Sequence, residues 1–95
     1  QLEETEKQLS LQLTRARLEL QSAIAKQQAS LKALEYAKEY YRITQLRYEQ
    51  NLALLIELSD ALSQFAGAQL SLSLSNADVL IKQSEVERAA AAYKL

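Results

Sequence analysis

An apolar stripe with heptad-like spacing runs along the first half of the sequence and constrains its fold more than any other feature. Successive members are four and three residues apart in alternation, so on an α-helix they share one face. A stripe of this length predicts one long helix that packs through this face. Its members are Leu9, Leu13, Ala16, Leu20, Ala23, Gln27, Ser30, Leu34, Ala37, Tyr41, Thr44 and Tyr48.

A comparable stripe follows in the second half of the sequence, with the same alternation of four and three residues. Its expected members are Leu58, Leu62, Phe65, Gln69, Leu72, Asn76, Val79, Gln83, Val86, Ala90 and Tyr93. Each half also carries apolar residues on a second face, for example Leu11, Leu18 and Tyr36 in the first and Leu70 and Leu74 in the second. One partner helix would leave these second faces in water, so we expect further helical neighbours.

Helix-breaking residues are almost absent from the chain. It has no Pro and one Gly, and Ala, Leu, Glu, Lys and Arg dominate its 95 residues, a composition typical of long helices and coiled coils. The alternating run Leu70 to Ser75 is also compatible with a half-buried strand. We favour a helix there, because the flanking residues keep helical spacing.

The two stripes lose their common phase between Glu49 and Leu55, and this segment is where we expect the chain to turn. Asn51 is the one residue of the segment that readily adopts left-handed geometry. The sequence thus predicts an all-α fold, a long antiparallel helical hairpin of coiled-coil type with its turn near residues 50–54. The expected helices cover about 2–50 and 54–94, with the turn at 51–53, in a single domain over 1–95 that is part of a larger protein. The alternative is one continuous helix of roughly 135 Å.

The charged residues argue against several classes of function. Eleven basic and twelve acidic side chains leave a net charge of −1, which gives little attraction to nucleic acid or to an anionic membrane. Without His and Cys, nucleophile and base pairs of the common kinds cannot form. We therefore expect no enzyme activity, no cofactor, no metal site and no nucleic-acid partner.

Seven residues are candidates for packing between helices, because they belong to the stripes or to a patch of small residues. They are Tyr41, Tyr48, Leu58, Ala61, Leu62, Phe65 and Gly67. A mid-helix Gly costs about 1 kcal/mol relative to Ala, which close approach of another backbone at Gly67 would offset. Chance is the alternative explanation for this Gly.

Four large apolar residues lie at the predicted turn, where exposure to water should favour polar ones. They are Leu52, Leu54, Leu55 and Ile56. One interpretation is that they cap the core of the hairpin itself, and the other is that they dock onto a second protein. In the docking interpretation Arg47, Glu49, Gln50 and Asn51 supply a polar rim, and Ala53 completes the surface.

The string from Arg47-Tyr48 through Asn51-Leu52 to Leu58-Ser59-Asp60-Ala61 resembles the helix–turn–helix signature of the outer membrane factor family, the TolC-like exit ducts of bacterial efflux and type I secretion. Ala68-Gln69 and Asn76-Ala77-Asp78 occupy places similar to those of the family's returning helix. The resemblance covers about residues 36 to 93. Asn51 stands where the family usually has Gly, and Leu54 where a small hydroxyl residue is common.

The resemblance implies a hairpin in the wall of a passive periplasmic duct, which docks the helical hairpin of a periplasmic adaptor through residues 47 to 55. It also implies a homotrimer of the full-length protein and a place in the periplasmic portion of an outer membrane protein. Contact with the membrane would come only through β-barrel segments that the family has and this sequence lacks. Two alternatives stay open: an intracellular coiled-coil scaffold, and the hairpin of an adaptor itself.

Overall fold

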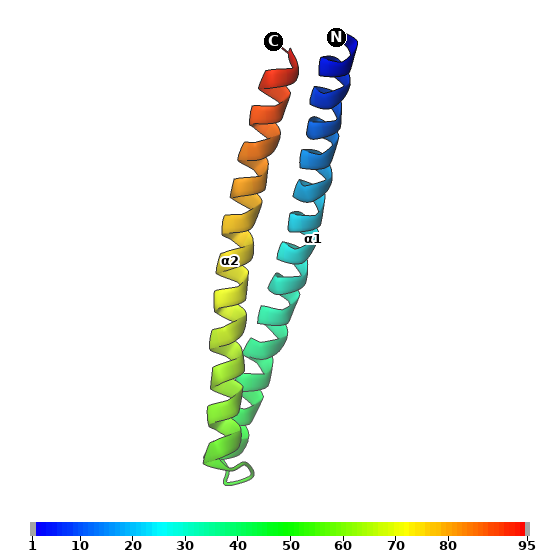
Figure 1. Ribbon diagram of the computed structural model, residues 1–95. Helices are drawn as coiled ribbons and strands as arrows, with labels where there is room; N and C mark the ends of the chain where they lie inside the picture. The colour runs from blue at the N-terminus through cyan, green and yellow to red at the C-terminus, as the bar shows by residue number, and fades with distance from the viewer. Residues whose placement is uncertain (1, 95) are drawn as a thin grey trace. The chain divides into compact units, whose positions relative to one another are not determined.

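The computed structural model describes residues 2–94 and consists of two long helices joined by a short loop (Figure 1). Helix α1 spans Leu2–Glu49, 48 residues, and helix α2 spans Leu55–Lys94, 40 residues. No strand occurs among the described residues. The predicted all-α helical hairpin with its turn near residues 50–54 is therefore confirmed, and the run from Leu70 to Ser75 is helical. A single domain within a larger protein stays a prediction.

Charges at the helix ends agree with the direction of each helix dipole. Glu3 and Glu4 lie in the first turn of α1 and Arg47 in its last turn, while Glu57 lies in the first turn of α2. Carboxylates are favourable near a helix N-terminus, and cations near a C-terminus. These charges therefore stabilise the helix ends, and the absence of Pro from the sequence allows both helices to continue without interruption.

The contacts divide the chain into two compact units. The terminal unit pairs the part of α1 up to Gln27 with the part of α2 from Ser75, and the tip unit consists of residues 28–74. Within the terminal unit, the Gln27 amide donates a hydrogen bond of 2.6 Å to Asn76 Oδ1. Within the tip unit, the rings of Tyr41 and Phe65 pack with their centroids 5.8 Å apart. Each unit is therefore held by its own contacts between antiparallel helices.

The burial of α1 follows the predicted stripe. From Leu9 to Thr44, every predicted member is buried or half-buried, and only Tyr48 at the end of the helix is exposed. The second face is exposed, as expected when only one partner helix is present: Leu11, Leu18 and Tyr36 all lie in water. The helical period alone thus identified the packing face of α1.

The packing face of α2 agrees with the predicted stripe at alternate positions and differs from it at most of the positions between them. Leu58, Phe65, Leu72, Val79 and Val86 are half-buried as expected. Between them, however, the covered residues are Ala61, Ala68, Ser75, Lys82 and Ala89, whereas the predicted Leu62, Gln69, Asn76 and Gln83 are exposed. At the end of the stripe, the predicted Ala90 is half-buried and the predicted Tyr93 is exposed. The spacing from a large residue to the next covered one is three, not four, and all of these covered residues except Lys82 are small.

Small residues account for the deepest part of the interface between the helices. The side chains classed as buried are Ala16, Ala23, Ala37, Thr44 and Ala61. The four members from α1 are multiples of seven residues apart, so they lie on one line of the helix. We define them together with Ala61 as the small-residue seam. Small side chains allow two helix backbones to approach closely, because the separation of packed helices depends on the side chains at the contact.

Candidate docking tip

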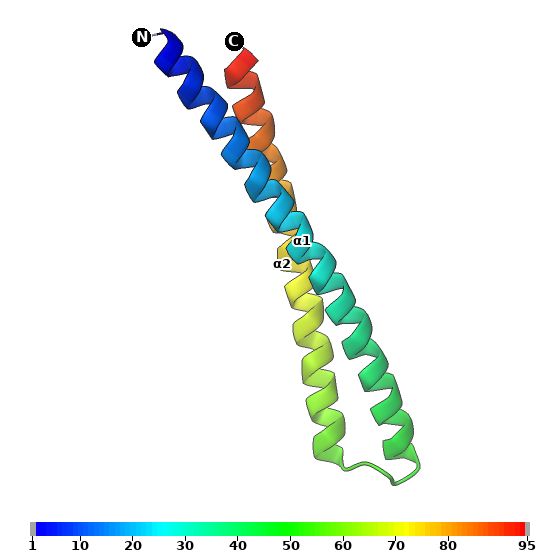
Figure 2. The same cartoon turned by 90° about the vertical axis from the view of Figure 1, so that its right-hand side faces the viewer.

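The end of α1 is closed by a left-handed residue at Asn51. Its φ is 60°, the one positive φ among the described residues, and Asn is the usual substitute for Gly in this region. The Asn51 N–H donates to the Tyr48 carbonyl at 3.0 Å, and the Leu52 N–H donates to the Arg47 carbonyl at 2.8 Å. These two bonds form a Schellman motif, which satisfies carbonyls that the helix end would otherwise leave unpaired. Figure 2 shows the loop that follows.

Arg47 closes the same turn a second time through its side chain. The guanidinium Nη2 donates to the Leu52 carbonyl at 3.1 Å, while the Arg47 carbonyl accepts the Leu52 N–H. Two residues five apart are therefore joined by two hydrogen bonds in opposite directions. One donor of Arg47 is thus engaged within the chain and fixes the direction in which the chain leaves α1.

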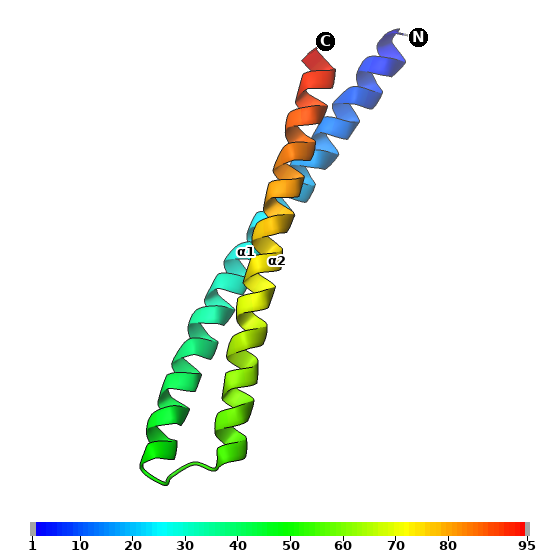
Figure 3. The same ribbon diagram turned by 90° about the vertical axis from the view of Figure 1, so that its left-hand side faces the viewer.

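Helix α2 begins without a side-chain cap. The Leu54 carbonyl accepts hydrogen bonds from Glu57 N–H at 3.0 Å and Leu58 N–H at 3.2 Å, which makes Leu54 the N-cap residue. Neither Ala53 nor Leu54 has a side-chain oxygen to accept from the first N–H groups of the helix, in contrast to Ser, Thr, Asp or Asn at this position. Figure 3 shows that α2 begins directly after the loop.

The turn gathers the apolar residues of the loop and of the first turn of α2 at one end of the tip unit. Leu52, Leu54, Leu55 and Ile56 are all exposed, with Leu54 at 66% and Ile56 at 73%, whereas Ala53 is half-buried. These four side chains therefore do not cap the core of the hairpin. We define them as the apolar tip. Large apolar groups concentrated at one end of a molecule are typical of an interaction site.

Four of the remaining predicted docking residues directly precede the apolar tip along the chain. Arg47, Glu49, Gln50 and Asn51 are exposed at the end of α1 and in the loop. The turn thus brings together all eight residues proposed from the sequence, Arg47 and Glu49 through Leu55. Whether they contact a partner stays a prediction.

The predicted packing residues divide into two groups. Tyr41, Leu58, Ala61 and Phe65 lie in the interface between the helices of the tip unit, and Ala61 is fully buried. Tyr48, Leu62 and Gly67 are exposed. A Cβ placed on Gly67 would meet nothing within 4 Å, so the helices of this chain do not approach it. Close approach at Gly67 would have to come from another chain.

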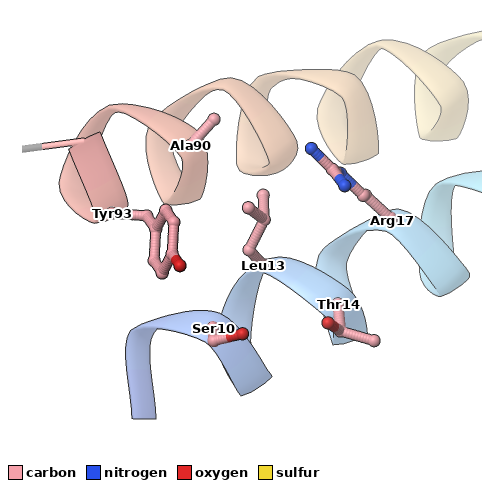
Figure 4. Close-up of a pocket in the computed structure, with 6 residues that line it drawn as sticks. All are labelled: Ser10, Leu13, Thr14, Arg17, Ala90 and Tyr93. Atoms are coloured by element: carbon pink, nitrogen blue, oxygen red, sulfur yellow. The ribbon is translucent and has the colours of Figure 1, made fainter. Parts of the chain in front are cut away.

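A hollow in the terminal unit was not predicted from the sequence. It has a volume of about 380 Å³ and is lined by Ser10, Leu13, Thr14, Arg17, Ala90 and Tyr93 (Figure 4). Leu13, Ala90 and Tyr93 belong to the predicted stripes, so the hollow is a loosely filled layer of the interface between helices. Its lining has hydroxyls and one guanidinium but no carboxylate, and so it offers no acid and base pair.

Among residues 2–94, the one ionisable pair with shifted pKa values lies on the outer surface of α1. The Arg42 guanidinium donates to Glu39 through Nε at 3.0 Å and through Nη2. This hydrogen bonding lowers the pKa of the Glu39 carboxyl and raises the pKa of Arg42. Both side chains are exposed, so the pair adds little to stability. Its effect is to cancel two charges on this part of the surface.

Two further properties concern metals and membranes. Residues 2–94 contain no group of three or more His, Cys, Asp or Glu side chains placed to hold a metal ion. Over the same residues, neither helix has a stretch long and apolar enough to cross a membrane.

Comparison with known proteins gives no relative. No protein-family model, no curated protein and no solved structure matches the chain.

Proposed function

We propose that the chain is a hairpin from the wall of an outer membrane efflux or secretion duct, and that it docks a periplasmic adaptor through the apolar tip. The observation that carries the proposal is the exposure of Leu52, Leu54, Leu55 and Ile56 on a turn that Asn51 and Arg47 hold in one conformation. The resemblance of residues 47–61 to the signature of the outer membrane factor family supports the same function.

The outer faces of both helices support a place in a wall of helices. Each helix covers one stripe against its partner in the hairpin and leaves a second apolar stripe exposed, with Leu11 and Leu18 on α1 and Leu74 and Ile81 on α2. A helix in the wall of a tube has neighbours on two sides, so it needs two such stripes. The proposal includes a homotrimer of the full-length protein, located in the periplasmic portion of the outer membrane protein.

The partner class follows from the chemistry of the apolar tip. Four aliphatic side chains without a charged residue among them would be matched by another apolar surface, and the surrounding Arg47, Glu49 and Gln50 would set orientation. A second helical hairpin that presents apolar side chains at its own turn has this chemistry. In this role the chain acts as a passive element, and transport is driven elsewhere.

The test is a titration of the isotope-labelled chain with purified helical hairpins from a panel of periplasmic adaptor proteins, followed by NMR. We expect chemical-shift changes that are confined to the backbone amides of residues 47–56. Leu54→Glu should weaken binding at least about tenfold, because it places a charge in an apolar contact. The matched control is Leu80→Glu, since Leu54 and Leu80 are both 66% exposed.

Three results would contradict the proposal. The first is chemical-shift changes along the sides of the helices in place of the tip. The second is an equal loss of binding affinity for Leu54→Glu and Leu80→Glu. The third is the absence of binding by any adaptor hairpin at millimolar concentration.

A further inference from the structure

The hollow of the terminal unit lies where the row of large side chains on the packing face of α2 ends. These large residues follow one another at intervals of seven, and they are half-buried up to Val86. The next position of the row is Tyr93, which is 48% exposed. Residues 89–92 between them are four alanines. Small side chains of α2 therefore lie near Leu13 in this layer, and a volume of about 380 Å³ stays open beside them.

The polar groups of the hollow come from both helices. Ser10, Thr14 and Arg17 are four and three residues apart, which places them on one face of α1. In Figure 4 the side chain of Arg17 extends from α1 toward α2, and the ring of Tyr93 extends from α2 toward α1, with Leu13 between them. The hollow thus has an apolar middle, with a guanidinium on one side of it and a phenol on the other.

The guanidinium of Arg17 has no partner among the described residues. The ion pairs of this part of the chain involve Arg42 and Lys82, and Arg17 takes part in neither an ion pair nor a side-chain hydrogen bond with a described residue. Among residues 2–94, no carboxylate lines the hollow. One positive charge therefore borders the hollow without a negative charge to balance it.

This charge distinguishes the hollow from a second one in the same unit. The second hollow has a volume of about 420 Å³ and is lined by Gln12, Glu85, Arg88, Ala89 and Ala92. It contains one acidic and one basic side chain, so it favours neither sign of charge. Only the hollow beside Arg17 combines a single cation with apolar groups. Its volume lies in the range of about 300–1,000 Å³ that is common for ligand pockets.

We propose that the hollow of the terminal unit binds a small organic anion, a carboxylate with an aromatic or aliphatic body. The planar guanidinium of Arg17 presents N–H donors that match the two oxygens of a carboxylate. The apolar body lies against Leu13 and Ala90, beside the ring of Tyr93. This site uses none of the residues of the apolar tip, so it stands or falls separately from the proposed function.

The test is a titration of the isotope-labelled whole chain with cinnamate, an aromatic ring that carries one carboxylate, followed by NMR. We expect chemical-shift changes at the backbone amides of residues 10–17 and 89–93, with a dissociation constant of about 1 mM, as is common for a ligand of about a dozen atoms. The matched probe is cinnamyl alcohol, which has the same ring and no charge. It should bind at least about tenfold more weakly, because it cannot form a charge-assisted pair with Arg17.

Three variants test which residues form the site. Arg17→Gln should weaken the binding of cinnamate at least about tenfold, because it removes the cation. The matched control is Arg15→Gln, since Arg15 is exposed on the same helix but does not line the hollow, and it should change the affinity less than about threefold. Ala90→Leu places additional apolar atoms in the hollow and should abolish binding, while the circular dichroism of the chain stays helical.

Four results would overturn the inference. Equal affinity for cinnamate and cinnamyl alcohol would indicate apolar contact without a site for the carboxylate. Equal effects of Arg17→Gln and Arg15→Gln would indicate attraction by net charge alone. Unchanged binding by a helical Ala90→Leu variant would place the ligand outside the hollow. The fourth result is the absence of binding by cinnamate at about 10 mM.

Discussion

At the scale of single residues, the turn depends on Asn51 and Arg47. Asn51 adopts a φ of 60°, which side chains branched at Cβ adopt only with strain. Arg47 then fixes the next step of the chain through its two hydrogen bonds with Leu52. The position of the apolar tip therefore depends on two residues that are themselves polar.

Substitution of Asn51 tests the role of its φ. Asn51→Val should lower the free energy of unfolding by about 1–2 kcal/mol, because Val would be strained in the left-handed region. Asn51→Gly adopts this region without strain and should leave the free energy within about 0.5 kcal/mol. Urea unfolding followed by circular dichroism measures both. Equal stability of the two variants would contradict a turn that requires a positive φ at this position.

At the scale of the helices, the small-residue seam determines which faces meet. The buried residues Ala16, Ala23, Ala37, Thr44 and Ala61 are all small, and the large residues Leu58, Phe65, Leu72, Val79 and Val86 are half-buried around the seam. The residues that the helices bury most completely against each other are thus the small ones. A fully buried position of this kind, such as Ala61, has little room for additional atoms.

Substitution of Ala61 tests the close packing. Ala61 is 0% exposed, so Ala61→Leu should lower the free energy of unfolding by about 1–3 kcal/mol through overpacking. Ala66→Leu is the matched control, because Ala66 lies on the same helix in an exposed position and should change the free energy by less than about 0.5 kcal/mol. Thermal unfolding of the two variants distinguishes them. A neutral Ala61→Leu would mean that the helices are farther apart than the seam implies.

Much of this architecture could be predicted from the sequence, and the exceptions have physical reasons. The stripe of α1 and the turn at Asn51 follow from periodicity and backbone preference, and both agree with the structure. In α2, Ala61 and Leu62 were both predicted to pack between the helices, but only Ala61 is buried and Leu62 is exposed. The spacing of apolar residues alone cannot choose between two neighbours, because the choice depends on the rotation of α2 against α1. The hydrogen bond from Arg47 to Leu52 was not predicted, since it depends on the direction of the loop.

At the scale of the whole molecule, many large apolar side chains stay exposed after the two helices have packed against each other. Exposed large apolar residues occur at the apolar tip and on the outer sides of α1 and α2. The proposed function gives these surfaces two kinds of neighbour: an adaptor hairpin at the apolar tip, and duct helices along the outer sides of both helices. Both kinds of contact require that the chain folds back at Asn51, which places the apolar tip at one end of the tip unit.

The measurement that tests this requirement most directly is the distance between spin labels at Leu18 and Ser84, two exposed positions on opposite helices of the terminal unit. Labelled chain would be diluted with unlabelled chain, so that distances between copies do not contribute. The account predicts about 15–30 Å, from neighbouring helix axes 8–10 Å apart and the reach of the labels. A distance near 100 Å, the rise of one continuous helix between the two positions, would contradict it.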